Sequence, residues 1–341
     1  MKRWLCLLLC LSGLFCGCQS APEVPDTTAT TAETVETYLE GATVVGVCFP
    51  QSDGIWADRF SFWEEALKGL GYIPVLQDAQ SDVTLQIQQV KDLMRKVDLL
   101  VIAPVDSAML CQTLESAQIP IIAYDNMLTD TNKVSFLVTF DYFQMGQSMG
   151  REIYSLANAE NTIELFMAQA EQESSLRYYQ GLMDVLSAHI EDGNFTIPSG
   201  HLSFEDTVVP GGLPELAGQT MQRYLSLHYT PPKTDEETTA PVEMPDFVIA
   251  GSDEIAQSCL AQLQGDCIVC GLGGTQTDSL SYSIRKDYAG LDEACLLAVQ
   301  ALLAGNAPET NFDGGMFNNA VNLPTWLGTY DFLYLAEETA A

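Results

Sequence analysis

Residues 97–126 read VDLLVIAPVDSAMLCQTLESAQIPIIAYDN, and this stretch decides the fold. It holds two short apolar runs, Leu99–Ala103 and Ile119–Ala123, which have the length of buried strands. Between them, Ser107–Gln118 has the length of a helix. A strand, a helix and a second strand in this order indicate a βαβ unit of a parallel sheet.

Polar residues follow both predicted strands. Asp106 comes after the first strand, and Asp125 and Asn126 come after the second. Small ligands bind beyond the carboxyl ends of parallel strands, so these residues suggest where a ligand sits. Strands and helices alternate from Val44 onward, and the pattern restarts after Phe140. This exceeds what one core usually holds, so we predict an α/β fold with two doubly wound parallel-sheet lobes.

The beginning of the chain is typical of an exported protein. Two basic residues precede an apolar run, Trp4–Cys16, that is too short to span a bilayer. The run ends in Phe15–Cys18, which resembles the lipobox of bacterial lipoproteins. We therefore expect a lipoprotein signal peptide at residues 1–17 and a lipid anchor on Cys18. An ordinary signal peptide is the alternative, but no A-x-A cleavage site precedes the polar stretch.

The charge of the chain excludes some partners. Loss of residues 1–17 would change the net charge from −32 to −34, so nucleic acid and anionic membrane surfaces are poor partners. Residues 18–42 are polar and lack an apolar face, which indicates an acidic flexible tether. No later run has the ~20 apolar residues that a membrane span needs. Attachment to the membrane would therefore come from Cys18.

The cysteines and histidines do not indicate metal binding or catalysis. Cys267 and Cys270 have metal-like spacing, but there is no second such pair and no nearby His, so we favour core packing. The three histidines, His189, His201 and His228, neighbour no nucleophile or metal-ligand pattern. We expect no metal, no cofactor and no enzymatic activity.

Several motifs resemble one known family, the sugar-binding proteins of bacterial ABC importers of the xylose, ribose and galactose type. The closest subgroup is the xylose and multiple-sugar binders, and the similarity runs from about Val44 to Leu335. The motifs are KGLGY at Lys68–Tyr72, IAPVDS at Ile102–Ser107, IPIIAYD at Ile119–Asp125, IELF at Ile163–Phe166, GLMDVL at Gly181–Leu186, and Ser252-Asp253. The resemblance implies the type I periplasmic binding protein fold, with two lobes joined by three crossings and a sugar held in the cleft.

The resemblance also divides the chain. It implies an N-terminal lobe at residues 43–137 plus 284–310 and a C-terminal lobe at residues 138–283 plus 311–335. The three crossings would lie near Phe136–Thr139, Tyr282–Arg285 and Phe317–Leu323.

The family's ligand-binding positions carry over residue by residue. They fall on two aromatic residues and on eight further residues, namely Phe49, Trp56, Asp125, Asn126, Asp141, Glu173, Ser252, Asp253, Gly273 and Lys286. Aromatic rings stack on the C–H face of a sugar, and carboxylates and amides bind its hydroxyls. The alternative roles are core packing for Phe49, covering of a helix for Trp56, and capping of a turn for Asp125.

Three positions depart from the family. Asn126 stands where the xylose-type subgroup usually has Arg, and Gln172–Leu176 replaces Asp-Asn-Asn-Ala-Arg at the start of a distal-lobe helix. Gly271–Gly274 replaces a Gly-Gln-Asp motif, so a hydroxyl-binding carboxylate is missing. Such changes alter specificity by orders of magnitude or abolish pentose binding.

These patterns predict an extracytoplasmic, lipid-anchored solute-binding protein. It would close its lobes on a small polar ligand, most simply a monosaccharide, and present this ligand to the membrane subunits of an ABC permease. One alternative is a sensor subunit that signals to a membrane receptor kinase, and another is a receptor for a non-sugar ligand such as a nucleoside.

Overall fold

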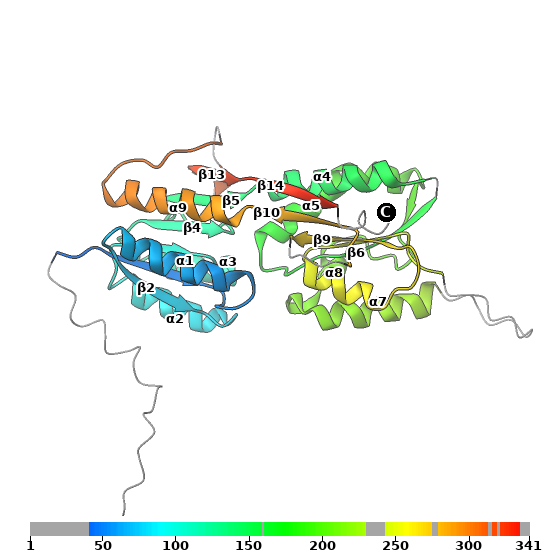
Figure 1. Cartoon of the computed structure of the whole chain (residues 1–341), viewed down its shortest axis with the longest axis horizontal. Helices are drawn as coiled ribbons and strands as arrows, with labels where there is room; N and C mark the ends of the chain where they lie inside the picture. The colour runs from blue at the N-terminus through cyan, green and yellow to red at the C-terminus, as the bar shows by residue number, and fades with distance from the viewer. Residues whose placement is uncertain are drawn as a thin grey trace, which may run out of the picture. The chain divides into compact units, whose positions relative to one another are not determined.

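The structure is a computed structural model, and it describes residues 41–158, 160–229, 243–274, 279–312, 316–318 and 321–334. The predicted signal peptide, the lipid anchor on Cys18 and nearly all of the predicted tether lie outside the described residues. From Thr43 onward the chain forms one compact unit with two six-stranded sheets, each covered by helices on both faces (Figure 1).

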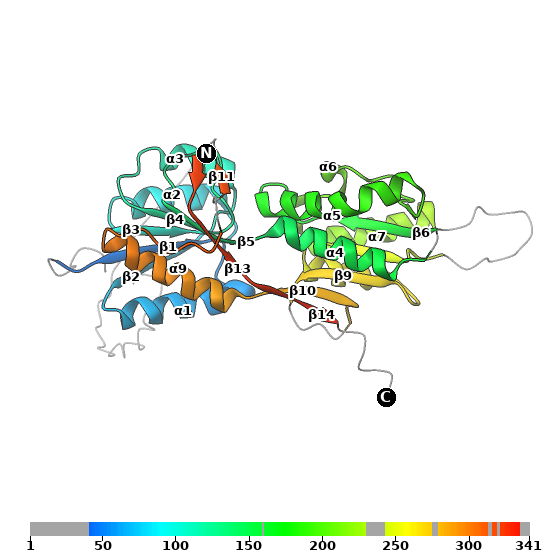
Figure 2. The same ribbon diagram turned by 90° about the horizontal axis from the view of Figure 1, so that it is seen from above.

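The first sheet is parallel throughout, in the order β13-β5-β4-β3-β1-β2. Its strands are β1 Val44–Phe49, β2 Ile73–Asp78, β3 Leu99–Ile102, β4 Ile121–Asp125, β5 Phe136–Phe140 and β13 Thr325–Gly328. Its helices are α1 Ile55–Gly69, α2 Val83–Leu93, α3 Ser107–Leu114 and α9 Tyr288–Leu303. The pair α1 and α9 covers one face, and the pair α2 and α3 covers the other (Figure 2).

The βαβ unit predicted from residues 97–126 is present as β3, α3 and β4. The helix ends at Leu114, four residues before the predicted end, and the second strand begins at Ile121. The preceding Pro120 has no N–H to donate to a neighbouring strand, so regular pairing starts after it. Every residue of β3 and β4 is buried, as expected for parallel strands with helices on both faces.

The second sheet has the order β14-β10-β9-β8-β6-β7, with one antiparallel pair, β10 and β14. Its strands are β6 Asn161–Phe166, β7 Phe195–Thr196, β8 Phe247–Ala250, β9 Ile268–Gly273, β10 Tyr282–Lys286 and β14 Tyr330–Tyr334. Its helices are α4 Tyr142–Leu156, α5 Glu173–Glu191, α6 Phe204–Thr207, α7 Pro214–His228 and α8 Asp253–Leu260. A short 3-10 turn, Pro210–Gly212, precedes α7, and β11 Met316–Asn318 pairs with β12 Val321–Leu323.

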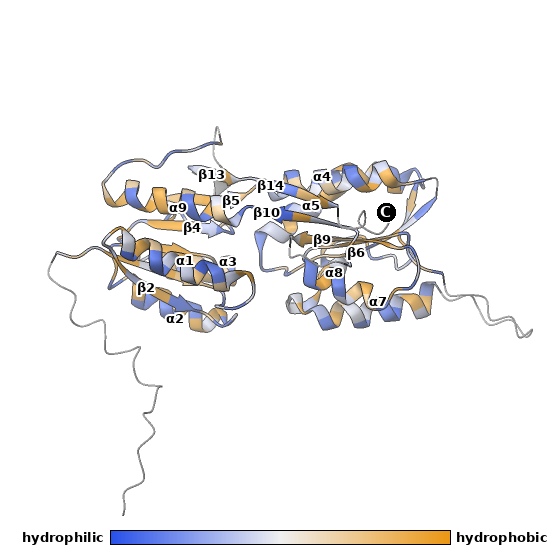
Figure 3. Ribbon diagram, viewed as in Figure 1, coloured by the Kyte–Doolittle hydropathy of each residue, from blue (hydrophilic) through white to orange (hydrophobic). Residues whose placement is uncertain are grey.

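Apolar residues are concentrated on the central strands of both sheets, whereas the helices carry both polar and apolar residues (Figure 3). This pattern is typical of sheets that are buried between helices. Among the described residues, no helix combines the length and the apolar character needed to cross a bilayer.

Three crossings connect the two sheets, at Asp141, Asp287 and Thr329 (Figure 2). Thr329 separates β13, in the first sheet, from β14, in the second. Asp287 and Thr329 bind each other, because the Asp287 N–H donates to the Thr329 carbonyl (3.0 Å) and the Thr329 hydroxyl donates to the Asp287 carboxylate (3.2 Å).

These positions correct the predicted division of the chain. Strand β5 pairs in the first sheet through Phe140, so the first lobe extends three residues beyond 137. Strand β10 pairs in the second sheet through Lys286, so this lobe extends beyond 283. The third crossing lies at Thr329 rather than within Phe317–Leu323, because residues 325–328 pair with β5 of the first lobe.

Two aspartates end the first two crossings by starting helices. Asp141 accepts from the Gln144 N–H (2.9 Å) at the start of α4, and Asp287 accepts from the Gly290 N–H (3.0 Å) at the start of α9. Such caps satisfy backbone donors that a helix leaves free at its N-terminus. As a result, Tyr142 and Tyr288 occupy equivalent places, each as the first residue of a helix after a crossing.

Candidate ligand-binding site

A cavity of about 600 Å³ is lined by residues of both lobes. The first lobe contributes the loop after β1 and the residues that follow β4. The second lobe contributes the first turns of α5, α7 and α8 and the end of β9. The carboxyl ends of both sheets therefore border the cavity, as is usual for ligand sites in open α/β sheets.

Asp125 is held in the cavity wall by its backbone conformation and by its side-chain contacts. It has a positive φ of 63°, and it is only 4 % exposed. Its carboxylate accepts hydrogen bonds from the hydroxyls of Tyr142 (2.5 Å) and Tyr288 (3.2 Å). A non-glycine residue in this backbone region costs free energy, and such strain is concentrated at functional sites.

The two tyrosines act as donors at any physiological pH. Burial, together with the neighbouring Asp125 carboxylate, raises the pKa of Tyr142 and of Tyr288 well above the usual value. Since one tyrosine follows the first crossing and the other follows the second, Asp125 joins both crossings to the end of β4.

Lys286 completes this cluster. Its ammonium group lies 4.0 Å from the Asp125 carboxylate and donates to the Tyr142 hydroxyl at 3.1 Å. It also lies 4.8 to 5.6 Å from the ring centroids of Phe140, Tyr142 and Tyr288. Aromatic faces attract a cation at this distance, so the charge of Lys286 is held within the hinge.

The aromatic side of the cavity is formed by Trp56. Its ring packs against the rings of Phe49 (centroids 5.1 Å apart) and Tyr124 (6.2 Å). Trp56 lines the cavity, whereas Phe49 is fully buried behind it in the core. The structure therefore gives Phe49 the alternative role of core packing.

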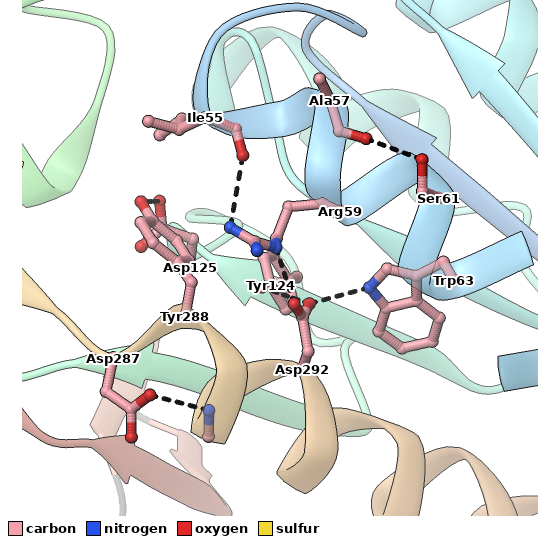
Figure 4. Close-up of polar contacts among 11 residues, drawn as sticks. Ile55, Ala57, Arg59, Ser61, Trp63, Tyr124, Asp125, Asp287, Tyr288 and Asp292 are labelled. Carbon is pink, nitrogen blue, oxygen red and sulfur yellow. Dashed lines mark hydrogen bonds and ion pairs between the residues drawn. The ribbon is translucent and has the colours of Figure 1, made fainter. Parts of the chain in front are cut away.

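A buried ion pair supports this wall from behind. The Asp292 carboxylate lies 2.7 Å from Nε of Arg59 and accepts from Trp63 Nε1 (3.0 Å) and from the Tyr124 hydroxyl (2.7 Å) (Figure 4). The Arg59 guanidinium lies 5.3 Å from the ring centroid of Tyr288. Burial raises the pKa of Asp292 to about 6, although these hydrogen bonds and Arg59 act against the shift.

The structure brings six of the ten residues with predicted ligand contacts to the cavity wall. These are Trp56, Asp125, Asn126, Ser252, Gly273 and Lys286. The other four, Phe49, Asp141, Glu173 and Asp253, are not among the described residues that line it.

Each of the polar residues away from the wall has another role in the structure. Asp141 caps α4, and Glu173 forms an ion pair with Arg177 (2.5 Å), one turn further along α5. Asp253 is fully buried and accepts from the Ser283 hydroxyl (2.7 Å). It lies under Gly271, where an added Cβ would come within 2.1 Å of the Asp253 carboxylate.

Several residues of the wall were not predicted from the sequence. Tyr142, Ser175, Tyr178 and Tyr288 line the cavity, together with Gln169. Tyr142, Tyr178 and Tyr288 lie in helices with a spacing equally typical of core positions, so no sequence signal separates them from packing residues. Ser175 lies within Gln172–Leu176, the stretch that departs from the family at the start of a distal-lobe helix.

The described residues contain no group of His, Cys, Asp and Glu that could hold a metal ion. Cys267 and Cys270 are free thiols, and burial raises the pKa of Cys267 to about 12. Burial also raises the pKa of Cys270.

The fold and the cavity define a two-lobed binding protein, and comparison with known proteins identifies its family. Residues 45–278 match the model of the periplasmic binding protein domain, so the chain belongs to that family. Proteins of this family bind solutes outside the cytoplasm and are not enzymes, in agreement with the predictions from the sequence.

The chain is similar to particular members of the family. It is 27 % identical over 314 residues to the multiple sugar-binding periplasmic receptor ChvE of Rhizobium radiobacter, covering 84 % of this chain and 85 % of that protein. It is 28 % identical over 179 residues to the multiple sugar-binding periplasmic protein SbpA of Azospirillum brasilense, covering half of each. Among solved structures, an ABC transporter solute-binding protein from Clostridium phytofermentans with bound β-D-glucose is 26 % identical. Its TM-score is 0.77, and the match covers 86 % of this chain and 94 % of that one.

Proposed function

We propose that this protein is the sugar-binding component of an ABC importer. One observation carries the proposal. Trp56 lines the same cavity as Asn126, Ser175 and Tyr178, whose side-chain oxygens are buried and have no hydrogen-bond partner among the described residues. An aromatic ring can stack on the C–H face of a sugar, and neighbouring polar groups can bind the hydroxyls of the sugar. Sugar recognition needs both kinds of contact. The relatives named as sugar-binding proteins support the same conclusion.

The mechanism is closure of the two lobes. A ligand that contacts residues after β1 and β4 in the first lobe and residues at the start of α5 in the second stabilises the closed arrangement. The three crossings act as the hinge, and the cluster around Asp125 lies where two of them meet. The membrane subunits of the importer would then distinguish the loaded protein from the empty one.

A lipid on Cys18 would attach the protein to the membrane. The sequence Phe15–Cys18 supports lipidation of Cys18, which would hold the protein at the outer face of the cytoplasmic membrane or in the periplasm. Mass spectrometry of the protein from membranes tests this part. A diacylated N-terminal peptide beginning at Cys18 is the expected result, and an unmodified N-terminus elsewhere would contradict it.

A thermal-shift screen tests the proposed ligand class. The purified protein is heated with pentoses, hexoses, polyols and nucleosides, each in large excess. A ligand at ~100 times its Kd adds about 2.7 kcal/mol to the stability, which corresponds to a rise of several degrees in Tm. We expect such a rise with at least one sugar.

Matched variants locate the binding site. Asn126→Ala removes a polar group of the cavity wall and should reduce the shift caused by the sugar. Asn306→Ala changes an exposed residue beyond α9 and should leave the shift unchanged. A rise with nucleosides alone would overturn the sugar assignment.

A further inference from the structure

Three helices differ from the rest in how they begin. Among the nine described α-helices, α1, α5 and α7 have no side chain that caps the N-terminus. The other six are capped, by Asp82, Asp106, Asp141, Ser203, Ser252 and Asp287. The three uncapped helices all begin on the cavity wall, at Ile55, Glu173 and Pro214 or in the residues next to them.

An uncapped helix N-terminus is a donor site. The first backbone N–H groups have no partner within the helix, and the helix dipole places a partial positive charge there. Anions bind at such ends. Two of the three ends, those of α5 and α7, belong to the second lobe and therefore form the same wall.

A second and independent observation points to a ligand in this cavity. Three polar side-chain atoms are buried without a hydrogen-bond partner among the described residues, and their residues line the cavity: Asn126 Oδ1, Ser175 Oγ and Tyr178 Oη. Each of these residues is more than nine-tenths buried. A buried polar atom without a partner costs free energy, which a ligand would recover by supplying one.

The chemistry of these atoms differs between the two lobes. In the first lobe, Asn126 Oδ1 is an acceptor and suits the hydroxyl of a sugar. In the second lobe, Ser175 and Tyr178 carry hydroxyl donors on the first turns of α5, beside its uncapped end. Burial raises the pKa of Tyr178 well above the usual value, so its hydroxyl remains a donor.

The carboxylates of the cavity wall do not offset the excess of hydrogen-bond donors in the second lobe. The Asp125 carboxylate already accepts from Tyr142 and Tyr288. Asp53 and Glu254 are the other acids among the described lining residues, and both are exposed to solvent. The buried hydroxyls of Ser175 and Tyr178 are therefore available as donors at the second-lobe wall.

We propose that the ligand of this cavity is a sugar acid, whose carboxylate binds the second-lobe wall at Ser175, Tyr178 and the N-termini of α5 and α7. Its hydroxylated ring faces Trp56 and Asn126 of the first lobe. This inference rests on the proposed function and narrows the class of sugar.

Isothermal titration calorimetry of the purified protein tests the inference. Pairs that differ only in the carboxylate are compared, namely D-glucuronate with D-glucose and D-galacturonate with D-galactose. We expect at least one acid to bind about tenfold more tightly than its neutral partner, because hydrogen bonds to a charged group are the stronger ones.

Variants of α5 assign the effect to its wall. Tyr178→Phe and Ser175→Ala should each weaken binding of the acid about tenfold and reduce its advantage over the neutral sugar. The matched controls on the same helix are Tyr179→Phe and Ser187→Ala, whose hydroxyls bond to the carbonyls of Leu202 and Met183. These controls should leave both affinities unchanged. Melting curves establish whether each variant folds. If Tyr178→Phe does not fold, Ser175→Ala alone tests the role of the α5 wall.

The outcomes separate the inference from the proposed function. If the neutral sugar binds as tightly as the acid, or if Tyr178→Phe weakens both equally, the sugar-acid inference is overturned and the sugar receptor stands. If neither member of any pair binds, the sugar-acid inference is overturned, and the thermal-shift screen with other sugars decides the proposed function.

Discussion

At the residue scale, Asp125 joins parts of the chain that are far apart in sequence. Its carboxylate is held by Tyr142 and Tyr288, and Lys286 lies 4.0 Å away. Removing one member of a buried charged cluster leaves the remaining charges without a partner, and this lowers the stability. The residue that closes β4 therefore stabilises the hinge as well as the wall of the cavity.

The variant Asp125→Ala should lower the free energy of unfolding by about 3 kcal/mol, because it leaves Lys286 without its carboxylate and two buried hydroxyls without an acceptor. Urea denaturation measures the change. The control is Asp331→Ala, which removes the exposed partner of Arg285 and should cost less than about 1 kcal/mol. Equal losses for the two variants would contradict the role given to Asp125.

Asp292 makes the stability depend on pH. Its folded-state pKa is about 6, above the value of about 3.9 expected for an unfolded chain, so the folded protein holds this proton more tightly. The contribution of Asp292 to stability is therefore full below about pH 4 and is lost as the pH rises to about 6. Over this window the loss is about 2 kcal/mol.

Comparison with Asp292→Asn isolates this effect. Unfolding free energies of both proteins are measured between pH 4 and 7, and the difference between wild type and variant is plotted. The wild type should lose stability relative to the variant as the pH rises from 4 to 6. A difference that is independent of pH would show that Asp292 does not titrate in this range.

Which residues reach the cavity could be predicted only in part. Asp125 and Asn126 follow from the rule that ligands bind beyond the ends of parallel strands. Phe49 also ends a strand, but neighbouring aromatic rings enclose it completely. Ser175 lies within Gln172–Leu176, which the resemblance singled out, whereas Tyr178 could not be identified, because its place in the cavity wall depends on how closely α5 packs on α4.

At the element scale, this packing depends on glycine. A Cβ on Gly181 of α5 would lie 1.9 Å from the Phe143 carbonyl oxygen of α4, and one on Gly146 would lie 2.0 Å from the Tyr178 carbonyl oxygen. Backbone atoms cannot move aside as the end of a flexible side chain can. The close contact of the two helices therefore fixes the position of Tyr178 in the cavity wall.

Gly181→Ala should force the helices apart and lower the free energy of unfolding by about 2 kcal/mol or more. It should also weaken ligand binding through the displacement of α5. Gly69→Ala provides the control, since nothing lies within 4 Å of an added Cβ at this last residue of α1. That substitution should change the stability by no more than about 1 kcal/mol. Denaturation curves that coincide for both variants would contradict the account.

The order of elements could be predicted better than their connections. The βαβ unit at residues 97–126 follows from two apolar runs and a helix-length segment. The crossings could not be derived from periodicity, because β5, β10 and β13 continue without a break to the residues where the chain changes sheet. Thr329 alone separates β13 from β14, and a single residue leaves no signal in the pattern.

At the scale of the whole molecule, the proposed mechanism is that ligand binding brings the lobes together. Small-angle X-ray scattering of the purified protein should show a smaller radius of gyration with saturating sugar than without it. The same sugar should cause no change in Asn126→Ala at a concentration that saturates the wild type alone. An unchanged radius upon saturation of the wild type would remove hinge closure from the mechanism.

The most direct test of the central claim is a calorimetric titration of the purified protein, and of its Trp56→Ala variant, with the sugar that gives the largest thermal shift. Tyr154→Ala, which changes an exposed ring outside the cavity, is the control. We predict one binding site per chain, an affinity at least about tenfold lower in Trp56→Ala, and an unchanged affinity in the control. Binding that is equally tight in Trp56→Ala, or no binding of any sugar by the wild type, would contradict a sugar site in this cavity.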